Sequence, residues 1–103
     1  MLFRSHLPSN YTNANTSTFL VFKELRSVLR MNADVTERRF ISGKVPNGKV
    51  ATVVAISKQG NDYFLGKETI TTGVNVTSSN IQKVILKPVK ASLADIKAFL
   101  ATL

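Results

Sequence analysis

The chain has 103 residues, with 14 Lys and Arg against six Asp and Glu, a formal net charge of +8, and neither Cys nor Trp. This length fits one domain with a modest core, and the absence of Cys excludes disulfides, thiolate metal sites and a cysteine nucleophile. No stretch approaches the ~20 apolar residues of a membrane-spanning helix, so we expect no membrane partner.

The first 18 residues are rich in Ser, Thr and Asn, above all from Ser9 to Thr18. Side chains of this kind bond to nearby backbone groups and weaken regular structure. We therefore expect residues 1–18 to form a polar, flexible or edge-lying arm, and residues 19–103 to form the single folded domain.

The segment from Phe19 to Met31 fits two structures. Its apolar residues can be placed along a short amphipathic helix, but the β-branched and aromatic run from Thr18 to Phe22 favours a strand. We favour a strand that continues or bends near Glu24.

A hairpin is predicted over residues 37–58. Arg38 to Val45 and Lys49 to Lys58 read as strands, and Asn47-Gly48 supplies the residues of a tight turn between them. Because both faces of the second strand are mostly apolar, we expect it to be central in the sheet.

Two further strands are predicted, from Tyr63 to Thr72 and from Ile81 to Val89. Gln59-Gly-Asn-Asp forms the turn before the first of these strands. Gly66, inside that first strand, is a candidate bulge. A polar connection, residues 73–79, leads to the second.

A C-terminal helix is predicted from Ser92, because Ser92-Leu-Ala-Asp95 resembles a capping box. Its apolar stripe includes Leu93, Ile96, Phe99 and Leu100 and runs to the end of the sequence. Such a short helix must bury this face, either on its own sheet or on the sheet of a partner subunit. The fold class is thus α+β: an antiparallel sheet with a C-terminal helix, expected to pack in a dimer through these four residues.

The basic residues are spread along the predicted strands rather than gathered in a tail. A polyanion would offset their mutual repulsion, and nucleic acid is the commonest such partner. If the strands are adjacent, several cations share one sheet face suited to phosphate contacts. The candidate nucleic-acid-binding residues are Arg38, Lys44, Lys49, Lys58, Lys83 and Lys87. Aromatic side chains for base stacking are few, with Phe40, Tyr63 and Phe64 as the candidates.

Residues that would indicate catalysis or a cofactor are missing from the sequence. His6 is the single histidine and has no neighbouring ligands in its polar segment, and Asp34 with Glu37 reads as a surface charge cluster beside Arg38 and Arg39. The glycines match no phosphate-binding loop. We expect neither an enzyme, nor a cofactor, nor a metal site.

From the predicted hairpin onward, the sequence resembles the coat proteins of small single-stranded RNA bacteriophages. The residues that carry the resemblance are Glu37-Arg-Arg-Phe-Ile-Ser, the Asn47-Gly48 turn, the strand Val50 to Ile56, the run Thr69-Ile-Thr-Thr-Gly-Val, the strand Ile81 to Val89, and the helix Ala91 to Leu103. The resemblance implies a dimer with its terminal helix on the partner's sheet. It also implies assembly into an icosahedral shell, with the sheet facing RNA inside.

Three functions remain open at this point. The first is a self-assembling coat subunit that encloses single-stranded RNA and is found in the virion. The second is a small basic single-stranded nucleic-acid-binding protein in the cytoplasm. The third is a phage accessory protein that binds another protein.

Overall fold

The computed structural model describes residues 2–12, 14–34, 39–42, 45–74, 76 and 81–103. Over these residues the chain forms nine strands and one helix. In chain order they are β1 (Leu2–His6), β2 (Thr16–Phe22), β3 (Ser27–Arg30), β4 (Asn32–Asp34), β5 (Arg39–Ile41), β6 (Val50–Gln59), β7 (Asp62–Thr71), β8 (Ile81–Ile85), β9 (Val89–Ala91) and α1 (Leu93–Leu100). The predicted α+β class is confirmed.

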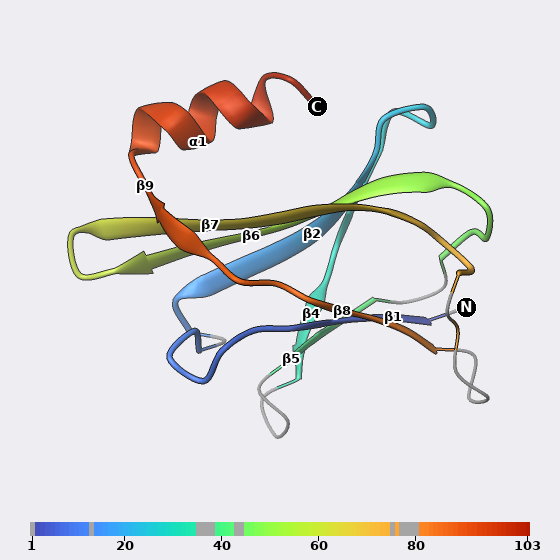
Figure 1. Ribbon diagram of the computed structural model, residues 1–103, viewed down its shortest axis with the longest axis horizontal. Coiled ribbons are helices and arrows are strands. Elements are labelled where there is room, and N and C mark those ends of the chain that lie inside the picture. Colours follow the sequence, from blue (N-terminus) through green and yellow to red (C-terminus); the bar gives the residue numbers. More distant parts are fainter. Residues whose placement is uncertain (1, 13, 35–38, 43–44, 75, 77–80) are drawn as a thin grey trace.

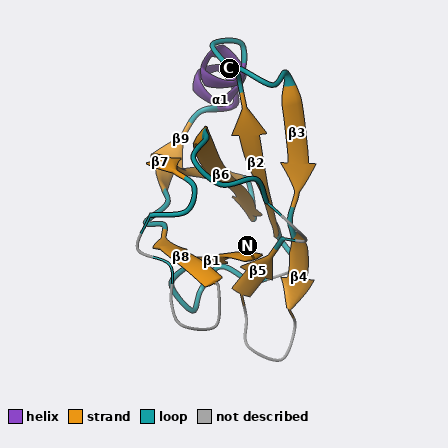
Figure 2. Cartoon of the chain, turned by 90° about the vertical axis from the view of Figure 1, so that its right-hand side faces the viewer, coloured by secondary structure: helices purple, strands orange, loops and turns teal. Residues whose placement is uncertain are grey.

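The elements form three layers, which Figure 1 and Figure 2 show from two sides. The smaller sheet has the strand order β4-β5-β1-β8, and the larger sheet has the order β3-β2-β6-β7-β9. Neighbouring strands are antiparallel except for β1 and β8, which are parallel. The larger sheet is the middle layer. The smaller sheet covers one of its faces, here called the inner face, and α1 covers the opposite, outer face (Figure 1).

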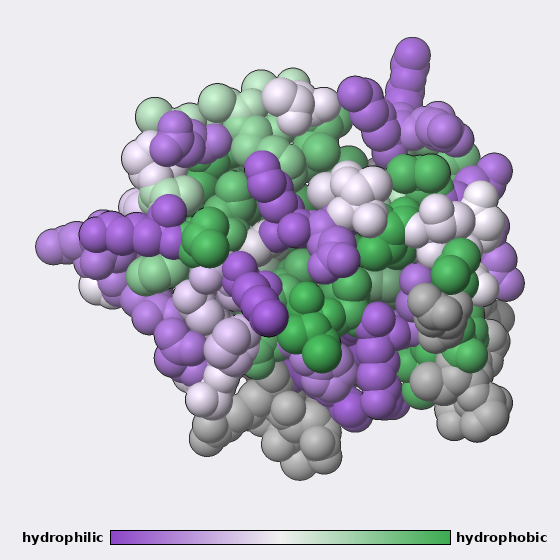
Figure 3. Space-filling view, viewed as in Figure 1, coloured by the Kyte–Doolittle hydropathy of each residue, from purple (hydrophilic) through white to green (hydrophobic). Residues whose placement is uncertain are grey.

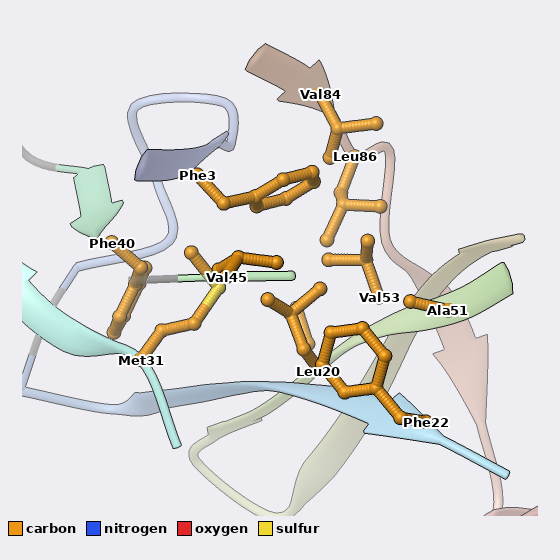
Figure 4. Packing of buried hydrophobic residues seen from close by; sticks show 11 residues of the cluster. Phe3, Leu20, Phe22, Met31, Phe40, Val45, Ala51, Val53, Val84 and Leu86 are labelled. Carbon is orange, nitrogen blue, oxygen red and sulfur yellow. The ribbon is translucent and has the colours of Figure 1, made fainter. Parts of the chain in front are cut away.

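The main core fills the space between the two sheets (Figure 4). Phe3 and Phe40 enter it from the smaller sheet, and Leu20, Phe22 and Val53 enter it from the larger one. Alternate residues of a strand point to opposite faces, so one side of each sheet supplies this core. Side chains on the other side of the smaller sheet's strands, such as those of Arg4 and Lys83, point away from this core.

The position of β6 explains why its sequence is apolar on both faces. It lies between β2 and β7, which confirms the predicted central position. Val53 faces the core between the sheets, whereas Val54 packs with Leu65 and Ile96 beneath α1. Each face of this strand is thus covered by another layer.

The polar N-terminal segment contributes a strand to each sheet instead of forming a flexible or edge-lying arm. β1 lies between β5 and β8, inside the smaller sheet. Its Phe3 and Ser5 are fully buried, and the Phe3 N–H donates a hydrogen bond to Ser42 Oγ at 3.0 Å. β2 begins at Thr16, within the same polar segment. Alternation over the five residues of β1 is too short to stand out beside a long run of Ser, Thr and Asn.

Between Phe19 and Met31 the strand interpretation is correct. β2 and β3 pair as an antiparallel hairpin, and the chain turns over Lys23 to Arg26, close to the predicted bend at Glu24. Arg26 has a φ of 49°, an uncommon left-handed conformation for a residue with a side chain.

The predicted hairpin over residues 37–58 is wrong. Its two halves belong to different sheets, because β5 pairs with β1 and β4 while β6 pairs with β2 and β7. The chain crosses between the sheets near Val45, which is buried in the core. Gly48 does adopt a positive φ of 72°, but its N–H donates to the carbonyl oxygen of Thr72 at 2.7 Å. The Asn47-Gly48 turn is therefore hydrogen-bonded to Thr72, the residue that follows the C-terminal end of β7.

The predicted strand from Ile81 to Val89 is divided in two. β8 belongs to the smaller sheet and β9 to the larger one, with Pro88 in the crossing segment, where its lack of an N–H is tolerated. Gly66 forms no bulge, since the pairing of β6 with β7 continues through it. A Cβ added at Gly66 would lie 3.2 Å from Pro88 Cγ, so this glycine makes room for the crossing chain.

The predicted C-terminal helix is present and packs on its own sheet. Ser92 is the N-cap, and its Oγ accepts a hydrogen bond from the Asp95 N–H at 3.0 Å. Ile96 is 2% exposed, Phe99 and Leu100 are half-buried, and Leu93 is 43% exposed. Of the described helical side chains, only Ile96 is fully covered within the chain.

Candidate nucleic-acid interface

The outer face of the smaller sheet carries a row of basic side chains. Buried Phe3 and Ser5 alternate with Arg4 and His6 in β1, and Lys83 is exposed between buried neighbours in β8. Because side chains alternate across a sheet, Arg4 and Lys83 lie on the side away from the core. The outward residues Arg4, His6, Lys83 and Ile85 are here called the β1–β8 face.

Arg4 and Lys83 are register partners on parallel strands. Neighbouring strands lie about 4.8 Å apart, so these two positively charged side chains extend from adjacent backbone positions. The other register partner of Arg4 is Ile41 of β5, which is uncharged. Like charges that face one another on a sheet repel, so we expect this pair to lower stability in the absence of a bound anion.

Lys83 and Lys87 share one surface, as the sequence predicts. Both are exposed and both line a hollow of about 770 Å³ beside the end of β1. Val84 and Leu86 point the other way into the core. In Figure 3, hydrophobic and hydrophilic side chains lie next to one another over the course that β8 and β9 take in Figure 1.

Lys49 and Lys58 do not lie together, and Lys58 does not join this surface. They stand at opposite ends of β6, which at the usual rise per residue places them roughly 30 Å apart. Lys58 lies on the outer side of the larger sheet, where its Nζ is 5.7 Å from the centre of the Tyr63 ring. The expectation that Lys58 shares one face with Lys83 is therefore wrong, and the placement of Lys49 with Lys83 stays a prediction. Arg38 and Lys44 lie outside the described residues.

Two basic residues of the smaller sheet were absent from the sequence-based set. Arg4 escaped attention because β1 is short and lies in a polar segment. Arg39 is the register partner of His6 on β1 and of Asp34 on β4. The half of the sheet formed by β1 and β8 is the more basic one.

The expected stacking aromatics lie elsewhere. Phe40 is 3% exposed and belongs to the core, and Tyr63 and Phe64 are half-buried on β7 of the larger sheet. The named side chains of the β1–β8 face are basic or aliphatic. This composition suits phosphate contacts better than base stacking.

Two other features of the described part of the chain bear on metal ligation and membrane crossing. No group of three or more His, Asp or Glu side chains could hold a metal ion there. In that same part, no helix is long and apolar enough to cross a membrane.

Comparisons with protein-family models, with curated proteins and with solved structures found no match for this chain. The fold and the β1–β8 face therefore have to be interpreted from this chain's own residues.

Proposed function

We propose that this chain is a coat subunit of a small single-stranded RNA bacteriophage. In this proposal the subunit dimerises, the dimers assemble into an icosahedral shell, and the β1–β8 face meets the RNA enclosed in the virion. The observation that carries the proposal is the placement of Arg4 opposite Lys83, together with Lys87 on the same side.

Phosphate groups would remove the cost of this like-charge pair. A net charge of +8 on 103 residues already opposes the compact state, and the Arg4–Lys83 pair adds a local repulsion. An RNA backbone brings one negative charge per nucleotide, and attraction between its phosphates and the two cations would offset their mutual repulsion. A surface of this kind binds RNA largely without regard to sequence, which suits a protein that packages a whole genome.

Assembly is supported by apolar side chains at the two edges of the larger sheet. Val28 on β3 is 64% exposed, and Val89 on β9 is 66% exposed. Edge strands also present unpaired backbone groups, which favour association with another chain. The exposed Leu93 and the half-buried Phe99 and Leu100 leave part of the helix open to a second subunit. The dimer contact through Leu93, Ile96, Phe99 and Leu100 remains a prediction.

The alternative is a small basic protein that binds single-stranded nucleic acid without forming a shell. The same cations support it, but binders of that kind usually stack successive bases on aromatic side chains. The named residues of the β1–β8 face include no aromatic side chain, and the candidate stacking residues Phe40, Tyr63 and Phe64 lie in the core or on the larger sheet. This placement favours the coat proposal.

RNA binding at several salt concentrations tests the part that both proposals share. Binding of a labelled single-stranded RNA should weaken steeply as salt rises, with a log–log slope of about −0.7 for each phosphate neutralised. Binding that is independent of salt would contradict both proposals. Particle size then separates a shell from a monomeric or dimeric binder.

A further inference from the structure

The hollow beside Lys83 has a composition that plain phosphate binding does not require. It lies where β1 ends and β8 passes, and its volume of about 770 Å³ is in the range of small-molecule sites. The side chains that matter for its chemistry are His6, Pro8, Glu68, Lys83, Ile85 and Lys87. They combine cations, an apolar wall and one carboxylate.

Lys83 and Lys87 both line this hollow and contribute positive charge to it. Lys83 and Lys87 are both exposed and lie on the same side of their segment, separated by Ile85. Among the described residues, neither forms an ion pair with a carboxylate. Their ammonium groups are available to the phosphates on either side of one nucleotide.

Glu68 gives the hollow a hydrogen-bond acceptor that repels phosphate. It comes from β7 of the larger sheet, beyond the stretch of that strand that pairs with β9, and it is exposed. An ionised carboxylate is acceptor-only and has two oxygens. Its partner in a nucleic acid must therefore be an N–H group of a base or a hydroxyl group of the sugar.

The apolar wall offers van der Waals contact to a base, although it has no aromatic ring for stacking. Ile85 is 68% exposed, and Pro8 lies on the same hollow. An unpaired base that leaves its strand can contact such side chains and present its Watson–Crick edge for hydrogen bonding. Guanine carries two adjacent N–H donors on that edge, whereas uracil carries one donor flanked by two carbonyl oxygens. A carboxylate consequently accepts two hydrogen bonds from guanine and is repelled by the carbonyls of uracil.

We propose that this hollow binds one unpaired nucleotide of single-stranded RNA and prefers guanine, with Glu68 accepting hydrogen bonds from the base and Lys83 and Lys87 holding the flanking phosphates. This inference rests on the proposed RNA-binding function and adds a base preference at one position. The rest of the β1–β8 face contacts the backbone without regard to sequence.

The test compares three RNA pentamers bound to the full chain: all uridine, one central guanosine, and one central inosine, which lacks the 2-amino group. Two paired hydrogen bonds to a base discriminate by about 1–3 kcal/mol, so the guanosine pentamer should bind about fivefold or more tightly than all-uridine. The inosine pentamer should fall between them. Glu68→Gln should abolish most of this preference.

Glu24→Gln is the matched control, because Glu24 is also an exposed acid, and it lies in the β2–β3 turn. Both substitutions raise the net charge by one, so only the loss of the Glu68 acceptor should change the ratio between pentamers. If Glu68→Gln keeps the wild-type ratio, or if the wild type does not discriminate, the guanine site is refuted while salt-dependent RNA binding stands. If no pentamer binds even at low salt, the RNA-binding function is refuted together with the site.

Discussion

Arg4 and Lys83 are register partners on the parallel strands β1 and β8, on the side of the smaller sheet that faces away from the core. We expect two like charges at such positions to cost stability in the isolated chain. In our proposal, RNA phosphates remove this cost, so the pair links folding to binding.

Replacing Lys83 by Gln should therefore move stability and binding in opposite directions. Loss of the repulsion should raise the free energy of unfolding by about 0.2–1 kcal/mol, and loss of a phosphate contact should weaken RNA binding and make its salt slope shallower. Urea denaturation and RNA titration at several salt concentrations measure the two effects. Lys58→Gln is the control, because Lys58 stands opposite Tyr63 on the larger sheet. A variant at Lys83 that loses stability, or that binds RNA with an unchanged salt slope, would contradict the assignment.

Reversing two charges on this surface should prevent packaging. Changing both Lys83 and Lys87 to Glu leaves the buried Val84 and Leu86 in place, so the subunit should still fold. The particles should be empty or unstable, because the inner surface would now repel phosphate. Circular dichroism checks the fold, and absorbance at 260 and 280 nm reports the RNA content. Normal RNA content in this double variant would show that another surface meets the RNA.

The helix should be held on the larger sheet mainly by one side chain. Ile96→Ala removes a residue that is 2% exposed and packs with Val54 and Leu65, which should cost about 2–5 kcal/mol. Leu93→Ala at a 43% exposed position should cost much less in a monomer. Comparing the urea midpoints of the two variants tests this difference. A large loss at Leu93 that depends on protein concentration would instead support the predicted dimer contact.

The turn before β6 should depend on backbone conformation alone. Gly48 has a φ of 72°, and an added Cβ would meet no atom within 4 Å, so we expect Gly48→Val to act mainly through backbone strain. The expected loss is about 1–2 kcal/mol, because a left-handed conformation is costly for a residue with a side chain. Lys49→Val, one residue later, is the control and should have a smaller effect. Equal thermal stability of the two variants would refute the requirement for glycine at this turn.

The sequence was most informative where a local signal determines a local structure. Ser92 begins the helix, and the turn at Gly60 joins β6 to β7 in uninterrupted register. The apolar faces of β6 also indicated its central position correctly. Each of these features depends on side chains close to one another in the chain.

The sequence was least informative about which strands pair with one another. The Asn47-Gly48 pair specified a positive φ at Gly48 but did not show that β5 and β6 belong to different sheets. The choice of partners follows from the burial of distant residues such as Phe3 and Val45, which meet only in the folded core. Lys83 and Lys87 were grouped correctly because they are close in the sequence. Arg4 was missed and Lys58 was misplaced because their positions depend on which distant strands are partners.

Sizing of the purified full chain, with light scattering and absorbance at 260 and 280 nm, tests the central proposal most directly. A coat subunit should form a megadalton-scale particle that contains RNA and protects it from nuclease. A monomer or dimer that carries no RNA, under conditions in which the protein is folded, would contradict the coat function.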